Sequence, residues 1–270
     1  MRKTLSDNLK ELGYEIINYQ NIVKFDNTIF DSIDTEEKAY WLGFIYADGY
    51  ISSTEYTFEI SLKGDDKEHL NKFNKFMKHN DPNHVKVGNV SCNGKICERC
   101  RWGVKDKHLW EILKSYGCIP NKSLILKFPS LEIFKNKSLV KDFIRGYWDG
   151  DGTITFQDKE HQNIQLKVLG TEDFLTDIQE NLPLKYVYSL TNNSPNNTIT
   201  KVLSINGKNA FELAYYLYNN SNIYLKRKFD KYLYFCRVYK ELYTKLQTEN
   251  REVCDDNPVL SSEIKESEPV

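Results

Sequence analysis

The sequence has no hydrophobic run long enough to cross a membrane. A membrane-spanning helix needs about 18 to 20 consecutive apolar residues, and no such run occurs in the 270 residues. The N-terminal stretch MRKTLSDNLKELGYE also lacks the apolar centre of a signal peptide. These absences predict a soluble, intracellular protein that makes no membrane contact. With 40% hydrophobic residues, a chain of this length can bury a sizeable core.

The chain also lacks an excess of either charge. Its 37 basic and 38 acidic residues give a net charge of −1, but for nucleic acid binding the distribution of charge matters more than its sum. From Tyr239 onward there are 8 acidic and 4 basic residues, which leaves 33 basic and 30 acidic residues before that point. The body of the chain can therefore carry a basic face. The polar end, without helical or strand periodicity, predicts an acidic, disordered tail.

Cysteine is sparse, and only the segment SCNGKICERC holds a cluster. Cys92, Cys97 and Cys100 have the spacing Cys-x4-Cys-x2-Cys, and Cys118 or His108 could supply a fourth zinc ligand. The alternative is a β-hairpin whose turn is CNGK, with reduced thiols on its strands. Because tetrahedral zinc sites demand strict ligand geometry, we favour the hairpin.

Two segments about a hundred residues apart end in an acidic residue followed by glycine. They are YWLGFIYADGYI, residues 40–51, and DFIRGYWDGDGTI, residues 142–154. The C-terminal end of a helix carries unpaired carbonyls and partial negative charge, so Asp48 and Asp151 are unfavourable there. Asp-Gly is also a common helix stop, in which the Asp is merely solvated. The duplication favours a functional reason for these acids.

The residues after each of these segments repeat one order of elements. The strand patterns YTFEISLKG and NIQLKVLG are each followed by a helical pattern, with Gly64 and Gly170 at matching places. Each half continues with a hairpin and a helix. A similar segment, here called the exit segment, then ends each half: NKSLILKFP or NIYLKRKFD. Matched positions lie 101 to 106 residues apart, which indicates two copies of one fold.

This repeat predicts an α+β fold of two tandem αββαββα units related by an approximate two-fold axis. The predicted divisions are an N-terminal extension (1–38), a first repeat (39–129), a second repeat (130–238) and a C-terminal segment (239–270). FPSLEIFKNKS would bridge the repeats. We expect a short helix in TLSDNLKELGY and assign the extension no chemistry.

Small residues predict that the two helices pack closely. Gly43 and Ala47 lie four residues apart in one helix, as do Gly146 and Gly150 in the other, so each pair shares a face. Packing through these faces would bring the two acids together at the helix ends. A divalent cation would relieve their repulsion, because carboxylates and helix-terminal carbonyls are oxygen ligands that magnesium prefers.

The segments WLGFIYADG and IRGYWDGDG resemble the two signature motifs of the LAGLIDADG homing endonucleases, in the form that carries both copies in one chain. The resemblance covers about residues 35–235. It implies a saddle of two antiparallel sheets astride double-stranded DNA, with the motif helices at its centre. It also implies that Asp48 and Asp151 bind Mg²⁺ or Mn²⁺, aided by the carbonyls of Ala47 and Gly150.

The resemblance further implies a metal-dependent endonuclease that breaks both strands of a long, non-palindromic DNA site. The protein would act as a monomer without an obligate protein partner, and without a protein nucleophile. The sixth motif position departs from the family pattern, with Tyr46 in one copy and Asp149 in the other. Since family catalysis uses the eighth position, we treat Asp149 as secondary.

Basic and amide side chains that position water also occur in the active sites of this family. The candidates here are Lys201 and Arg101 as catalytic residues, with Glu59, Gln165, Lys105 and Lys208 at the periphery. Polar residues that alternate with apolar ones in the hairpins could place one sheet face in the major groove, although any half-exposed sheet alternates in this way. The candidate DNA contacts are Lys86, Lys95, Arg99, Lys167 and Lys185.

Two other functions fit the same fold. One is an intron RNA maturase, and the other is a DNA-binding regulator that does not cleave. Both predict the loss of one acid. Because Asp48 and Asp151 are both present, the sequence favours the nuclease.

Overall fold

The structure is a computed structural model that describes residues 8–9, 11–14, 25–92, 94–120, 122–156, 163–194 and 197–238. The predicted acidic tail, 239–270, lies outside the described residues. Of the short helix expected near the N-terminus, the described residues 8, 9 and 11 are helical. Across the described residues, no helix is both long and apolar enough to span a membrane.

The first repeat has the predicted order of elements. Helix α2 (Glu36–Asp48) leads directly into β1 (Gly49–Ile51) and β2 (Thr57–Lys63), and η2 (Gly64–Asp66), α3 (Lys67–Phe76), β3 (Lys86–Cys92), β4 (Lys95–Lys105) and α4 (Lys107–Ser115) follow. The strands form one antiparallel sheet in the order β1-β2-β4-β3. The short 3₁₀ helices η3 (Lys122–Leu124) and η4 (Leu131–Ile133) then lead to the second repeat.

The second repeat copies the first. Its elements are α5 (Leu139–Asp151), β5 (Gly152–Phe156), β6 (Ile164–Thr171), α6 (Glu172–Glu180), β7 (Thr191–Ser194), β8 (Asn197–Asn206) and α7 (Gly207–Tyr218). The sheet order β5-β6-β8-β7 matches that of the first sheet. The two exits differ, because residues 226–238 form a further helix where the first repeat has only η3. The predicted α+β class and tandem repeat are confirmed.

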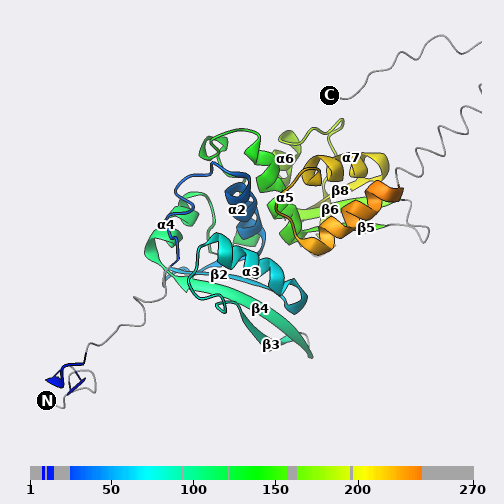
Figure 1. Cartoon of the computed structure of the whole chain (residues 1–270). Coiled ribbons are helices and arrows are strands. Elements are labelled where there is room, and N and C mark those ends of the chain that lie inside the picture. The colour runs from blue at the N-terminus through cyan, green and yellow to red at the C-terminus, as the bar shows by residue number, and fades with distance from the viewer. Residues whose placement is uncertain are drawn as a thin grey trace, which may run out of the picture.

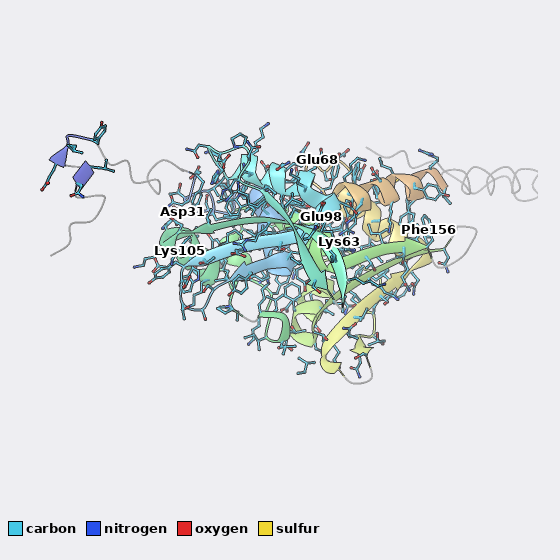
Figure 2. All side chains as sticks on the ribbon, turned by 90° about the horizontal axis from the view of Figure 1, so that it is seen from below. Asp31, Lys63, Glu68, Glu98, Lys105 and Phe156 are labelled. Carbon is cyan, nitrogen blue, oxygen red and sulfur yellow. The ribbon has the colours of Figure 1, made fainter. Side chains whose placement is uncertain are left out.

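Each sheet has one face covered by helices. In β2, Phe58, Ile60 and Leu62 are buried, whereas the alternate residues from Thr57 to Lys63 are partly or fully exposed. Side chains alternate between the two faces of a strand, so the exposed set lies on the opposite face. Helices α2 and α5, one from each repeat, lie side by side at the centre of the molecule (Figure 1). Strands of both sheets appear on the underside of the molecule (Figure 2).

Part of the predicted N-terminal extension belongs to the packed core. Phe30 is fully buried, and its carbonyl accepts a hydrogen bond from the Tyr116 hydroxyl (2.8 Å). Ile33 forms a parallel bridge with Phe134, in the segment that connects the repeats. Thr35 then caps α2, because its hydroxyl accepts from the Lys38 amide. Residues 25–35 therefore help to fix where α2 begins.

The cysteine segment is a hairpin. Cys92 pairs with Lys95 across a two-residue turn, in which Gly94 has φ +77°, as a tight hairpin turn requires. Cys97 is exposed whereas Cys100 is buried, so they lie on opposite faces of β4. Within the described residues, no group of three or more His, Cys, Asp or Glu side chains is arranged to hold a metal. The hairpin interpretation is confirmed by the strand register.

Candidate active site

The two motif helices cross through their glycines. A Cβ atom added to Gly43 would overlap the backbone carbonyl of Phe143, and one added to Gly146 would overlap that of Tyr40. One turn later, a Cβ atom on Gly150 would overlap the methyl group of Ala47. Backbones can approach this closely only where side chains are absent or small. The crossing sets the relative position of the two helix ends.

The two acids meet at these ends. A Cβ atom on Gly150 would lie 3.2 Å from Oδ2 of Asp48, so this carboxylate lies against the last turn of α5. Burial, and after it the negative charge of Asp151, raise the pKa of Asp48 to about 6. Burial also raises the pKa of Asp151. The fold thus holds two half-buried carboxylates together despite their repulsion.

This donor set suits a hard divalent cation. It consists of two carboxylates and the carbonyls at the ends of two helices, which are the oxygen ligands that Mg²⁺ accepts together with water. Among the described residues, fewer than three His, Cys, Asp or Glu side chains are arranged to hold an ion here, so backbone carbonyls, water or a substrate phosphate would have to complete its coordination. The raised pKa of Asp48 fits this role, since a cation would remove the cost of ionisation.

Two lysines accompany the acids, the buried Lys228 and the partly buried Lys122, and neither was predicted from the sequence. The ammonium group of Lys228 donates to the carbonyls of Trp148 (2.6 Å), Asp149 (2.6 Å) and Gly152 (2.5 Å), at the end of α5. In the first repeat, Lys122 donates to the carbonyl of Gly49. Each lysine therefore reaches the glycine that follows one motif acid.

The charges of these lysines act on the acids. Both lower the pKa of Asp48 and of Asp151, opposing the effect of burial. Burial in turn lowers the pKa of Lys228 to about 8 and also lowers that of Lys122. In the two segments NKSLILKFP and NIYLKRKFD, Lys122 and Lys228 follow the shared asparagine by one and by six residues, so the repeat does not match them to each other.

Tyr147 adds a hydroxyl beside one acid. It donates to the carbonyl of Leu169 (2.8 Å) and also lies close enough to Asp151 to lower the pKa of that carboxyl. Burial and the negative charge of Asp151 raise the pKa of Tyr147 well above its ordinary value. The corresponding residue in α2 is Phe44, so only the second half has this hydroxyl.

Asp149, at the sixth motif position, points into the protein. It has no exposed surface and accepts hydrogen bonds from the hydroxyls of Tyr40 (2.8 Å) and Tyr218 (2.6 Å) and from the amide of Leu225 (2.7 Å). Burial raises its pKa, while the charge of Lys228 and these hydrogen bonds lower it. Its treatment as secondary to Asp151 agrees with this position.

Arg101 and Glu59 lie on the exposed face of the first sheet. They form an ion pair with 3.0 Å between Nη2 and Oε1, which leaves Arg101 61% exposed. In the second sheet, Gln165 is buried and donates to Oδ1 of Asn206 (2.7 Å). These three candidates lie on the sheet faces opposite the helices.

Of the other three candidates, Lys105 alone lies on an exposed sheet face, the same face of β4 as Arg101. Strand alternation puts Lys201 on the same face as Leu203 and Ile205, which are buried, and its ammonium group lies 3.6 Å from Glu172 at the start of α6. Lys105 lies at the outer end of the first sheet (Figure 2). Lys208 is on α7, exposed, and within 3.9 Å of Glu212. The structure does not place Lys201 or Lys208 on the exposed sheet faces.

Most of the candidate DNA contacts do lie on these faces. Lys86 is directly opposite Arg101, and Arg99 is directly opposite Lys63, an exposed lysine that the sequence analysis did not select (Figure 2). Lys95 is the first residue of β4, directly after the hairpin turn. Lys167 is opposite Thr153 on the second sheet. Lys185 is not on a strand, and its ammonium group lies 3.4 Å from Glu212 of α7.

We expect Asp48→Asn to stabilise the metal-free protein at high pH. Ionisation of this buried carboxyl is penalised in the folded state, so its folded pKa of about 6 exceeds the ordinary value of 3.8. Stability is therefore lost as pH rises between these two values. Removing the charge should increase the free energy of unfolding by about 1–3 kcal/mol at pH 8 and by almost nothing at pH 4. Urea denaturation at both pH values measures this, and an equal gain at both would contradict it.

The fold matches that of solved homing endonucleases. The homing endonuclease I-WcaI, bound to its DNA recognition sequence, superposes with a TM-score of 0.51 and 15% identity, covering 81% of this chain and 96% of that chain. The LAGLIDADG homing endonuclease I-GzeII, in complex with a DNA target, gives 0.47 and 13%, covering 84% and 99%. I-SmaMI, bound to uncleaved DNA in the presence of calcium ions, gives 0.46 and 11%, covering 77% and 92%. No protein-family model and no curated protein matches the sequence.

The chain therefore has the fold of the LAGLIDADG homing endonucleases. At these identities the superpositions define the architecture, and the chemistry must be argued from the residues of this chain.

Proposed function

We propose that this protein is a site-specific, divalent-metal-dependent DNA endonuclease that breaks both strands of a long, non-palindromic site. The observation that supports this most is the meeting of Asp48 and Asp151 at the crossed helix ends, with the ammonium groups of Lys122 and Lys228 bonded to the backbone there. A site that served stability alone would not hold two carboxylates together at the negative ends of two helices. The exposed faces of the two sheets supply basic side chains for DNA.

The carboxylates of Asp48 and Asp151 would hold Mg²⁺ or Mn²⁺, with the carbonyls of Ala47 and Gly150 as further oxygen donors. When bound, the ion supplies Lewis acidity at the scissile phosphate and activates water. Lys122 and Lys228 supply two fixed positive charges beside this position, and the hydrogen bonds of their ammonium groups to backbone carbonyls hold them there. The partial burial of the site strengthens these interactions relative to water.

Recognition would be the task of the sheets. Lys63, Lys86, Arg99 and Arg101 lie together on the exposed face of β2, β3 and β4, and basic side chains in such an array neutralise phosphates. Each four-stranded sheet carries many exposed side chains, and the exposed residues of the first sheet differ from those of the second. An asymmetric protein surface of this kind fits a non-palindromic DNA site.

We expect Lys228→Met to slow cleavage on the order of tenfold to a hundredfold. Methionine approximates the length of the side chain but removes the positive charge beside the acids. Lys226→Met is the matched control, because Lys226 is exposed and pairs with Asp230, four residues later, at 2.7 Å. The measurement is the single-turnover rate on a cleavable site with Mg²⁺. Equal rates for the two variants would show that the buried charge has no part in the reaction.

The protein should be a monomer in solution, because both motif helices lie in one chain and already pack on each other. Light scattering should give a mass close to the 31.7 kDa of the chain at micromolar concentration. An obligate dimer would contradict the expectation that one chain supplies both halves of the site.

The function is tested by selecting cleaved sequences from a randomised DNA library with Mg²⁺. The proposal predicts one enriched, asymmetric site that is cut in both strands. Tight DNA binding by folded protein, with no cleaved sequence in the library, would instead favour a DNA-binding regulator. Preferential binding of structured RNA, without DNA cleavage, would favour a maturase.

A further inference from the structure

The two halves of the acid site are built differently. The sixth motif position is Tyr46 in α2 and Asp149 in α5. Tyr46 donates its hydroxyl to the carbonyl of Tyr116, whereas Asp149 is a buried acceptor of three hydrogen bonds. The two lysines near the acids also lie in different elements, Lys122 in the single turn η3 and Lys228 in the helix 226–238.

Asp149 anchors the start of the helix that carries Lys228. Its Oδ2 accepts from the amide of Leu225 (2.7 Å), the residue directly before the helix. A carboxylate at the N-terminus of a helix is favourable, because the first amides of the helix are unpaired and carry partial positive charge. Tyr40 and Tyr218 donate to the same carboxylate and fix its orientation.

The same segment is also held through Lys228. The ammonium group donates to three carbonyls at the end of α5, including that of Asp149. The side chain and the backbone of Asp149 therefore contact one short segment at two points, Leu225 and Lys228. In the first half, Lys122 donates to the carbonyl of Gly49, and Tyr46 contacts the chain six residues earlier, at Tyr116.

We propose that Asp149 is a positioning residue that fixes Lys228 at the end of α5, so that cutting of one DNA strand depends on this contact more than cutting of the other. At that place the charge of Lys228 acts on both acids, and more strongly on Asp48 than on Asp151. The inference rests on the proposed endonuclease function. Asp149 acts through Lys228 and does not itself touch DNA, because its side chain is fully buried. Tyr46 gives the α2 half no equivalent anchor.

The test compares Asp149→Asn with Tyr46→Phe, which changes the matching position of the other helix. Each strand of a duplex carrying the selected site is labelled separately, and both cleavage rates are measured in single turnover with Mg²⁺. Asp149→Asn should slow one strand on the order of tenfold relative to the other, as loss of a supporting hydrogen bond does at comparable sites, and nicked DNA should accumulate. Tyr46→Phe should leave the ratio of the two rates unchanged. Equal slowing of both strands by Asp149→Asn would mean that Asp149 only stabilises the fold.

A second variant tests the proposal if Asp149→Asn does not fold, and a second measurement tests it without DNA cleavage. Tyr218→Phe removes a single donor to the carboxylate and should change the strand ratio in the same direction by a smaller factor, even if Asp149→Asn does not fold. Amide hydrogen exchange at Leu225 reports the anchor without any cleavage. Faster exchange in the variants supports the anchor, and unchanged exchange overturns it. A parent protein that cuts neither strand refutes the proposed function, while the exchange result still decides whether Asp149 holds this segment.

Discussion

Asp48→Asn and Asp151→Asn should each abolish double-strand cleavage while DNA binding is preserved. Asparagine keeps the size of the side chain but removes the charge that would hold the metal, a role that a neutral amide fills poorly. We expect the rate with Mg²⁺ to fall on the order of 10³-fold or more, since the lost interaction stabilises charge that develops in the transition state. Affinity measured with Ca²⁺ should change little, because it depends mainly on phosphate contacts along the sheets.

A suitable control is Asp173→Asn, which makes the same chemical change at an exposed position in the first turn of α6. This variant should cut at the parental rate. If either motif variant still cuts both strands as fast as the parent, the acids are not the metal site. If both lose binding together with cleavage, the acids are architectural.

Gly146→Ala should be strongly destabilising even though alanine favours helices. In an unconstrained helix, this change would be stabilising by about 1 kcal/mol. Here the new methyl group would overlap the backbone carbonyl of Tyr40, and a carbonyl in a helix cannot turn aside. The two helices must separate, so we expect the free energy of unfolding to fall by about 3 kcal/mol or more. The measurement is urea denaturation, with cleavage as a second readout because the acids would move apart.

The matched control is Gly88→Ala on strand β3, where an added Cβ atom would have no neighbour within 4 Å. The same change in the unfolded chain occurs in both variants, so their difference isolates the helix crossing. Gly88→Ala should shift stability by less than about 0.5 kcal/mol. If Gly146→Ala were as well tolerated, the close approach of α2 and α5 would not hold in solution.

The features that sequence alone predicted are those with short-range signals. The small residues at four-residue spacing predicted the helix crossing. The alternation of apolar and polar residues predicted the strands and the exposed faces of the sheets. The Asn-Gly dipeptide gave the tight hairpin turn between Cys92 and Lys95. Each of these rests on residues that are close together in the chain, so no knowledge of the tertiary structure was needed.

The features that sequence alone missed depend on contacts between distant residues. Lys228 reaches the end of α5 from 76 to 80 residues away, and nothing in its local sequence distinguishes it from Lys226, which is exposed. Lys201 was a candidate because basic residues near the second strand pair resemble those of the family's active sites, but the register places it on the face with Leu203. A shift of one residue reverses the face of every side chain in a strand, and the start of β8 could not be fixed from the sequence.

The central claim is that Asp48 and Asp151 form the metal site of a nuclease. It is tested most directly by anomalous X-ray scattering from crystals of the protein bound to its selected DNA site, grown with Mn²⁺. The account predicts anomalous density within about 2–2.5 Å of oxygen atoms of Asp48 and Asp151, next to the scissile phosphates. Cleaved DNA in the crystal with the Mn²⁺ bound elsewhere, or with no metal at the two acids, would contradict it.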